Sequence, residues 1–544
     1  MSARTALALL VALALGLGWA SPGGAERGAD ERSGADDRSG ADGSAAGTTA
    51  AGRSEPEQRP ALVIGVVALP DGLDPAVDIN IGANGFRTLY SVFDRLIFRD
   101  FLAGGLRPGL AESWRWESET ELVLELRRGV TFHDGSAFTA EDVVFSLERV
   151  LEPGSDLVTA RGTFANVAAV EALGDHTVKI TTKGPDPVLE QVLTMQEASI
   201  VPAEAYAAGA AEFNRRPVGT GPYRVASFVA GDRLVLEPYD GYWGGTPTAG
   251  EVVFRVIPET AARVTALVTG EIDIAASLPP DQAAVLERFD GVEVRPAVLD
   301  NIHVLRYNTT HPVLRDVRLR RAMNLAIDRQ LLSDSLWGAV AVVPRGHQFA
   351  SFGDMYDASR PVAEFDPERA RALVKESGYA GEKVYLNAHP TWYTNGLAAA
   401  EAIVEMWRSV GIDAEVRVVP GPEELFGLPH DDPFAMVNMW SNSMRFADPA
   451  GGLWATWNPN APPQASGYWR APDEFNALGL EARSITDRDR RRRDYWRMLD
   501  IWEEEAPGTV LYYSVEFYGV REGVEWRPYS DFYIDLRPYN LAFR

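Results

Sequence analysis

Short apolar runs and helix-like segments alternate along this chain, and this alternation constrains the fold more than any other feature of the sequence. Residues 261–275 have the spacing of an amphipathic helix and then of a strand, with Gly270 at the change. Residues 397–419 repeat the arrangement, with Gly411 as the expected C-terminal cap of the helix. Units of this kind pack as helices against a sheet. The sequence therefore predicts mixed α/β lobes.

Local signals indicate where individual elements begin. The apolar run of residues 61–69 predicts a buried strand at the start of the folded body, and Glu121–Leu126 alternates as a strand does. Thr139 is a suitable N-cap for a helix, and Asp142 stands at the third helical position, where an acid strengthens the cap. Two later helices are expected to be capped by Asp316 and Asp328.

The first 60 residues are expected to direct export rather than to fold. Arg4 supplies a positive charge, residues 6–17 form an apolar run, and Gly18–Trp19–Ala20 offers small residues around a cleavage point. This pattern predicts a signal peptide over residues 1–20. An uncleaved membrane anchor is the alternative, although the run is shorter than the ~20 residues that span a bilayer. Residues 21–60 lack large apolar side chains, which predicts a disordered leader.

Charge and cysteine content exclude several partners and sites. The 544 residues carry a formal net charge of -25, which repels nucleic-acid phosphates and anionic membrane surfaces. No nucleic-acid partner is therefore expected. Cysteine is absent, which excludes disulfides, thiolate metal sites and a lipid anchor on cysteine. The expected location is the periplasm, as an exported protein without a lipid anchor.

The sequence carries none of the short motifs of the common enzyme classes. Its seven histidines are scattered without metal-ligand spacing, and no GxSxG or GxxxxGK[ST] motif occurs. No metal, cofactor or catalytic residue is predicted. The basic run Arg490–Arg493 is followed by Tyr495 and Leu499 at helical spacing. It is therefore expected on the solvated face near the start of an amphipathic helix, and not at an anion site.

Tryptophans gather in a polar segment that offers no amphipathic pattern to bury them. Trp440, Trp454, Trp457 and Trp469 lie among residues rich in Asn, Pro, Gly and Ser. Aromatic side chains on loops often line binding clefts, and packing of a long irregular segment is the alternative. Together the four favour a surface that contacts a ligand.

Four segments resemble, in order, those of the family 5 extracellular solute-binding proteins, the oligopeptide-, dipeptide- and nickel-binding group of ABC importers. They are LRRGVTFHDGSAFTAEDVVFSLERV from Leu126, GTGPYRV from Gly219, GYWGG from Gly241, and RYNTTHPVLRDVRLRRAMNLAIDRQLL from Arg306. The resemblance covers nearly all of residues 61–544.

The resemblance implies a fold and its division. The expected architecture is an α/β clamp of two lobes, of the periplasmic-binding-protein type, with an inserted subdomain in the first lobe. A ligand closes such a clamp when it binds the closed form better than the open form, so its contacts should come from both lobes. Lobe I is expected at residues 61–97, 217–300 and 508–544, its inserted subdomain at 98–216, and lobe II at 301–507.

The resemblance also places ligand contacts. In peptide-binding relatives, a Trp of lobe II is followed three residues later by an Asp that pairs with the α-ammonium group of the ligand. Trp440 matches the Trp, and Ser443 stands where the Asp would be. A hydroxyl there replaces a charge-assisted partner that contributes about 1.5 to 3 kcal/mol, which disfavours free peptide N-termini. The expected contacts are Trp392, Tyr393, Trp440, Asn442, Ser443, Trp454 and Trp457 in lobe II, and Asp78 and Asn80 in lobe I.

These observations together predict an extracytoplasmic substrate-binding protein that carries out no reaction. It is expected to capture, as a monomer, a small molecule or oligopeptide and to deliver it to an ABC permease and ATPase complex; the solute is a peptide, a peptide-like compound or an oligosaccharide. One alternative is a secreted hydrolase that uses two of the 77 acidic residues and consumes its substrate. The other is an exported peptide-binding chaperone or sensor without a permease partner.

Overall fold

The computed structural model describes residues 59–153, 157–207, 209–421, 424–425 and 427–544. The predicted signal peptide and the predicted leader lie outside these residues, apart from Arg59 and Pro60. Residues 60–544 form one unit by their contacts, and the following description concerns this unit.

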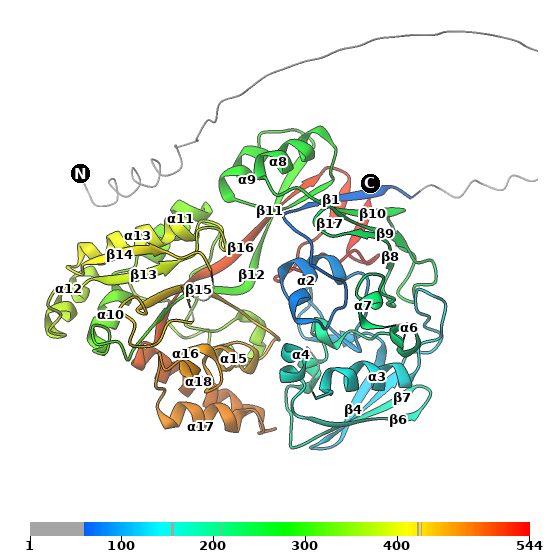
Figure 1. The fold of residues 1–544 in the computed structure, drawn as a ribbon, viewed down its shortest axis with the longest axis horizontal. Coiled ribbons are helices and arrows are strands. Elements are labelled where there is room, and N and C mark those ends of the chain that lie inside the picture. Colours follow the sequence, from blue (N-terminus) through cyan, green and yellow to red (C-terminus); the bar gives the residue numbers. More distant parts are fainter. Residues whose placement is uncertain (1–58, 154–156, 208, 422–423, 426) are drawn as a thin grey trace, which may run out of the picture. The chain divides into compact units, whose positions relative to one another are not determined.

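A ten-stranded mixed sheet runs through the unit in the order β14-β13-β15-β12-β16-β11-β1-β10-β9-β8. Figure 1 shows β12 and β16 between the two outer groups of strands. β1 pairs in parallel with β10 and β11, and β13 pairs in parallel with β14 and β15, as expected of α/β units. The strands are β1 Ala61–Val66, β8 Tyr223–Val229, β9 Arg233–Pro238, β10 Glu251–Val256, β11 Ile274–Leu278, β12 Val292–Tyr307, β13 Val384–Ala388, β14 Ala414–Val418, β15 Val437–Ser443 and β16 Gly508–Arg521.

β12 and β16 pass from one lobe into the other. We call the group of β1 and β8 to β11, with its attached segments, lobe I, and the group of β13 to β15 lobe II. The antiparallel pairing of β12 with β16 is regular from Val292 to Val298, shifts before Ile302 and shifts again before Val304. Because such irregularities bend a strand and increase its twist, the strand bends at the transition between the lobes.

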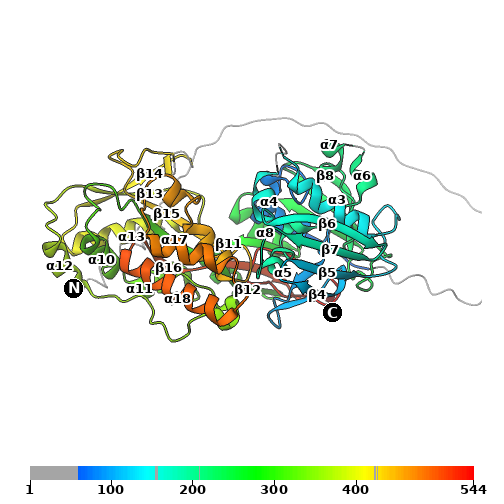
Figure 2. The same cartoon turned by 90° about the horizontal axis from the view of Figure 1, so that it is seen from below.

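A second, antiparallel sheet of four strands belongs to lobe I, in the order β4-β5-β7-β6 (Figure 2). Helix α3 (Ala140–Leu151) packs on it and begins with the reciprocal capping box of Thr139 and Asp142, as predicted. All four strands fall within the range predicted for the inserted subdomain, whose boundaries stay a prediction. They are β4 Ala111–Ser118, β5 Glu121–Leu126, β6 Val167–Gly174 and β7 Thr177–Thr182.

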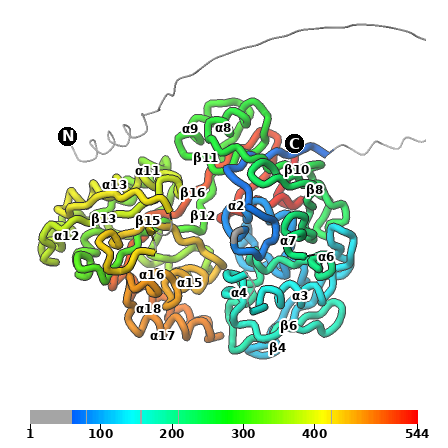
Figure 3. Tube along the Cα trace, viewed as in Figure 1, coloured from blue at the N-terminus to red at the C-terminus, as the bar shows by residue number. Residues whose placement is uncertain are grey.

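Helices lie against both groups of strands (Figure 3). Lobe I carries α2 Ala83–Leu89, α4 Val158–Thr163, α5 Leu189–Val192, α6 Ala203–Ala207, α7 Ala210–Phe213, α8 Thr260–Thr269 and α9 Pro280–Leu286. Lobe II carries α10 Val317–Leu325, α11 Arg329–Trp337, α12 Pro367–Glu376, α13 Gly396–Ser409, α15 Leu453–Trp457, α16 Pro462–Ala465, α17 Asp473–Ala482 and α18 Arg488–Glu505. The short strands are β2 Ile97–Arg99, β3 Leu106–Pro108, β17 Val524–Trp526 and β18 Leu541–Phe543.

Three predicted helix boundaries are confirmed, one at a C-terminus and two at N-termini. Gly270 ends α8 in the left-handed conformation, with φ of 80°. The side chain of Asp316 accepts the backbone N–H of Arg318, and that of Asp328 accepts the N–H of Leu331. These acids satisfy donors that an uncapped helix leaves without partners.

One surface prediction is wrong at Arg491, whereas its neighbours Arg490 and Arg493 are exposed as predicted. The run Arg490–Arg493 lies near the start of α18 as predicted, but Arg491 does not lie on a solvated face. Its buried guanidinium donates to both carboxylate oxygens of Asp448 at 2.9 Å and to the carbonyl of Ala482 at 2.9 Å. The helical repeat places Arg491 on the same face as buried Tyr495, where Asp448 offers an anionic partner.

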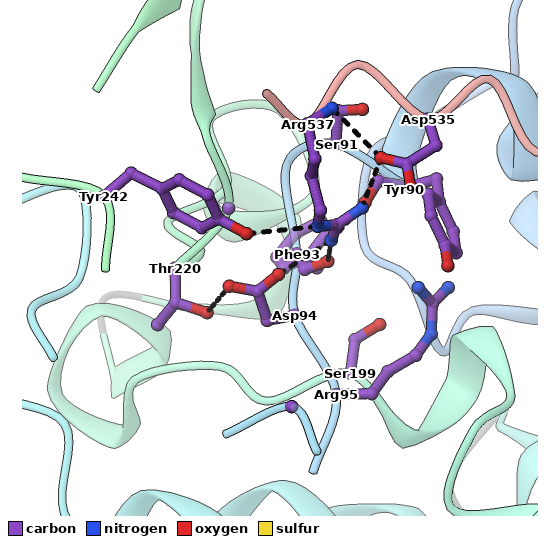
Figure 4. A network of polar contacts seen from close by, with 12 residues as sticks. Tyr90, Ser91, Phe93, Asp94, Arg95, Ser199, Thr220, Tyr242, Asp535 and Arg537 are labelled. Atoms are coloured by element: carbon purple, nitrogen blue, oxygen red, sulfur yellow. Dashed lines mark hydrogen bonds and ion pairs between the residues drawn. The ribbon is translucent and has the colours of Figure 1, made fainter. Parts of the chain in front are cut away.

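A buried charge network joins the C-terminal segment to the rest of lobe I (Figure 4). The guanidinium of Arg537 donates to Asp94 at 2.7 Å, to Asp535 at 2.9 Å and to the hydroxyl of Tyr242 at 3.2 Å. Asp94 also accepts the hydroxyl of Thr220 at 3.2 Å. The network thus connects the end of the chain to the segments GTGPYRV and GYWGG.

Candidate functional site

A cavity of about 280 Å³ lies at the bend of β12, and both lobes form its wall. Its size is close to the lower end of the range for small-molecule sites, roughly 300 to 1,000 Å³. The wall consists of Ile81, Gly82, Phe86, Thr159, Met195, Gln196 and Glu197 from lobe I, Leu299, Asp300 and Asn301 from β12, Ser443, Met444 and Arg445 from lobe II, and Ser530, Asp531, Phe532 and Tyr533 from the C-terminal segment.

Asp300 occupies the irregular stretch of β12 and is bonded to groups around it. Its carboxylate accepts the hydroxyls of Ser351 and Ser530, each at 2.8 Å, and forms an ion pair with Arg99 at the end of β2. Ser351 lies in the 3-10 helix η3 (Ala350–Met355) of lobe II. The side chain of Asp300 is 12% exposed, so solvent screens these bonds little. Asp300 therefore ties the bend of β12 to both sides of the cavity.

Arg445 reaches from lobe II to lobe I at the cavity wall. Its guanidinium donates to Glu197 at 3.0 Å and to the hydroxyl of Thr163 at 2.8 Å. Glu197 is 2% exposed, and among the described residues its second carboxylate oxygen, Oε2, has no hydrogen-bond partner. Separation of the lobes would take the cation away from a buried carboxylate, so this contact favours the observed arrangement of the lobes.

Asp531 faces the cavity from the C-terminal segment. One carboxylate oxygen accepts the backbone N–H of Phe532 at 2.7 Å. Within the described part of the chain, Asp531 forms no ion pair. Burial raises the pKa of the Asp531 carboxyl to about 6, and Arg99 lowers it by a smaller amount. The protein thus holds a poorly solvated carboxyl group in the cavity wall.

Asn442 and Ser443, the two predicted ligand contacts at the end of β15, lie on opposite faces of the strand. Ser443 lines the cavity, and its hydroxyl accepts the amide of Asn301 at 2.6 Å. Asn442 is buried, where its carbonyl accepts the guanidinium of Arg306 at 2.7 Å and its amide nitrogen lies 2.8 Å from His347 Nε2. Successive strand residues point to opposite faces. The structure therefore brings Ser443 to the cavity and places Asn442 in a polar network behind it.

Three aromatic residues that were predicted to contact the ligand pack against one another in lobe II. The ring of Trp440 makes edge contacts with Trp392 and Tyr393, with centroid separations of 5.7 and 6.1 Å. Trp392 is 37% exposed and stacks on His389. None of the three belongs to the cavity wall. Their contact with a ligand stays a prediction.

The other predicted contacts lie outside the cavity wall. Trp454 and Trp457 are 7% and 0% exposed within a hydrophobic core, in agreement with packing of the irregular segment rather than with a ligand surface. The carboxylate of Asp78 accepts the backbone N–H of Thr159 at 3.0 Å. Asn80 is 1% exposed and bonds the backbone of its own loop. Asp78 and Asn80 thus hold the loop that leads into the cavity wall.

Sequence reasoning missed the charged residues of the wall, Glu197, Asp300, Arg445 and Asp531. They lie in four distant segments of the chain, and no local motif marks any of them. Only the fold brings them together.

No group of three or more His, Cys, Asp or Glu side chains in the described ranges could hold a metal ion. Of the helices described, none is both long and apolar enough to cross a membrane.

The chain is similar to known proteins in both sequence and structure. The family model "Bacterial extracellular solute-binding proteins, family 5 Middle" matches residues 105–464. Di/tripeptide-binding protein 1 of Pseudomonas aeruginosa (strain UCBPP-PA14) is 27% identical over 486 residues, which cover 84% of this chain and 89% of that protein.

Two solved structures share the fold. The ABC transporter-associated periplasmic binding protein DppA of Helicobacter pylori, in complex with peptide STSA, matches with a TM-score of 0.75 and 23% identity, over 89% of this chain and 98% of that one. The ABC transporter substrate-binding protein CtaP of Listeria monocytogenes matches with a TM-score of 0.80 and 20% identity, over 90% of this chain and 100% of that one. The predicted fold class, a two-lobed α/β clamp, is confirmed.

Proposed function

Because this chain belongs to the bacterial extracellular solute-binding proteins of family 5, we propose that it captures one small solute between its lobes, delivers it to an ABC permease and catalyses no reaction. The cavity carries the proposal, because its wall comes from both lobes at the bend of β12. A solute bound there contacts both lobes at once and therefore stabilises their closed arrangement over an open one. Hinge closure then distinguishes the loaded protein from the empty one.

The solute we propose is a peptide or a peptide-like compound, with an oligosaccharide as the alternative. The similar proteins support the first class, since one is named for di- and tripeptides and another holds a peptide. Ser443 faces the cavity at the position where peptide-binding relatives are expected to carry the acid for the α-ammonium group. A serine hydroxyl forms no ion pair, so an amine in the solute must meet a different acid.

We also propose that the chain is exported to the periplasm and acts there as a monomer beside its permease and ATPase partners. The pattern of residues 1–20 supports export by a signal peptide, and the absence of cysteine from the sequence supports export without a cysteine-linked lipid anchor.

Native mass spectrometry of the protein secreted by its own host tests the proposed function. We expect one intact small molecule to remain bound to each chain, and fragmentation identifies it. The stripped protein should bind the identified molecule at one to one, and excess ligand at ~100 times its Kd should stabilise the fold by about 2.7 kcal/mol. Recovery of a chemically changed molecule after incubation would favour the hydrolase instead.

Replacement of Arg445 by methionine is expected to weaken solute binding by about fivefold. The change removes the bonds to Glu197 and Thr163 and leaves a buried carboxylate without its cation. The side chain of Arg445 is 38% exposed, so we expect a loss of only about 1 kcal/mol of closure energy. Titration calorimetry with the identified solute measures the effect.

The matched control is Arg497→Met. Arg497 pairs with Glu474 at 2.8 Å, and both residues lie on helices of lobe II. This variant loses the same type of ion pair without a contact between lobes, so its affinity should equal that of the wild type. Equal affinities for Arg445→Met and Arg497→Met would contradict a role of Arg445 in closure.

A further inference from the structure

Two of the three carboxylates in the cavity wall are engaged by cations of the chain itself. Glu197 forms an ion pair with Arg445 at 3.0 Å, and Asp300 forms one with Arg99. The third carboxylate, Asp531, has no such partner among the described residues. It is therefore the acid of the wall that is open to a cation brought by a solute.

Aromatic rings line the same cavity as Asp531. Phe86, Phe532 and Tyr533 belong to its wall, and the ring centroids of Phe86 and Tyr533 lie 5.4 Å apart. Rings attract ammonium and guanidinium groups through their faces. Arg87 already lies over the ring of Phe532 at 5.1 Å, and Arg95 lies over that of Tyr533 at 5.2 Å. Burial raises the pKa of Asp531 to about 6. A cation beside the carboxylate would offset its poor solvation.

The charged groups that act on Asp531 come from neighbouring segments. Arg99 and Arg95 lower the pKa of Asp531, and Asp300 raises it. Arg99 is bound to Asp300, while Arg95 packs over the rings of Tyr90 and Tyr533, at 4.6 and 5.2 Å. Neither arginine belongs to the cavity wall. These cations favour the ionised form of Asp531, whose side chain still lines the cavity.

We infer that Asp531 binds a positively charged group of the solute, so that the cavity selects compounds with a primary amine or a guanidinium group. This inference rests on the proposed function and specifies the class of solute. It places the amine against the C-terminal segment. An acid at position 443, as expected in peptide-binding relatives, would instead place the amine against lobe II. The hydroxyl of Ser443, which accepts the amide of Asn301, can still donate its proton to a neutral polar group of the same solute.

Binding of matched probes to the full chain tests the inference. The probes are alanyl-alanine and alanyl-lysine, each with a free and with an acetylated N-terminus, together with arginine, agmatine, putrescine and maltotriose, and any solute recovered by mass spectrometry. We expect the tightest binder to carry a cation, and loss of that cation to weaken binding by about 10- to 100-fold. Titration calorimetry measures each affinity.

Asp531→Asn keeps the shape of the side chain and removes its charge. It should weaken binding of the cationic probe by the same 10- to 100-fold, while the free variant unfolds at a temperature no lower than the wild type, because a neutral amide is less costly to bury. Asp232→Asn, which changes an exposed acid of lobe I, should leave the affinity unchanged. The unfolding temperature separates a lost contact from a misfolded protein.

The pH dependence supplies an independent measurement. A proton on Asp531 competes with the cation of the probe, so the affinity of the wild type should be about tenfold lower at pH 5 than at pH 7. The affinity of Asp531→Asn should be the same at both pH values.

The outcomes separate the inference from the proposed function. A neutral or anionic solute as the tightest binder, or an unchanged affinity of Asp531→Asn for a cationic probe, would overturn the inference and leave the proposed function standing. Absence of saturable binding by every probe and every recovered solute would overturn both.

Discussion

Replacement of Arg537 by methionine is expected to lower the free energy of unfolding by about 3 to 5 kcal/mol. Its guanidinium, 1% exposed, is the cation paired with two fully buried carboxylates, Asp94 and Asp535. Methionine fills much of the same volume but leaves both carboxylates in a medium that solvates charge poorly. Urea unfolding followed by tryptophan fluorescence measures the loss.

Two comparisons isolate the buried network as the cause. Arg544→Met removes an exposed ion pair with Glu525 near the same end of the chain and should change the stability by less than about 1 kcal/mol. The addition of Asp94→Asn and Asp535→Asn to Arg537→Met should recover part of the lost stability, because it removes the unpaired charges. An Arg537→Met protein as stable as the wild type would show that the network does not hold the C-terminal segment.

Three of the segments that carry the family resemblance contribute to the buried network or pack beside it. Thr220 in GTGPYRV and Trp243 in GYWGG both donate to Asp94. His133, within LRRGVTFHDG, bonds the backbone of GTGPYRV at two points. No residue of the cavity wall falls within any of the four segments. The sequence could therefore predict the fold class well, because its recognisable motifs form buried contacts that hold lobe I together.

The candidate site was predictable only where the family resemblance supplies a position. The resemblance implies an acid three residues after Trp440, which points to Ser443, and the structure brings Ser443 to the cavity wall. Glu197 and Arg445 could not be found in this way, because their contact depends on how two lobes approach each other. Asp531 follows the last long strand and carries no local motif.

Trp457 shows how a tryptophan of a polar segment can be buried in the protein core. Trp457 makes edge contacts with Trp469 and Trp502, with centroid separations of 5.6 and 5.5 Å. The partner Trp502 lies on α18, more distant in sequence than any periodicity would reveal. An irregular segment can thus bury aromatic rings against helices that follow it, without an amphipathic pattern of its own.

Acidification from pH 7 to pH 4.5 is expected to destabilise the fold by about 2 kcal/mol for each of three buried histidines, His133, His303 and His347. Burial lowers the pKa of each to about 4, whereas a histidine of the unfolded chain titrates near 6.5. Between these values the unfolded chain binds protons that the folded chain does not, so stability falls as pH falls. The raised pKa of Asp531 offsets part of this loss, because folding then favours its protonation. Urea unfolding at each pH measures the net change.

The hydrogen bonds of His133 make it the best position to verify the cause. The N–H of Gly219 donates to Nδ1 at 3.1 Å, so Nε2 carries the proton and donates to the carbonyl of Gly221 at 3.0 Å. Protonation of Nδ1 would break the first bond inside a core that solvates the charge poorly. In His133→Gln the amide retains a donor for Gly221 but does not titrate, so this variant should lose about 2 kcal/mol less than the wild type over the same pH interval. His430→Gln, which alters an exposed histidine, should follow the wild type. If His133→Gln lost as much stability as the wild type over this pH interval, protonation of His133 would not be a cause of the acid destabilisation.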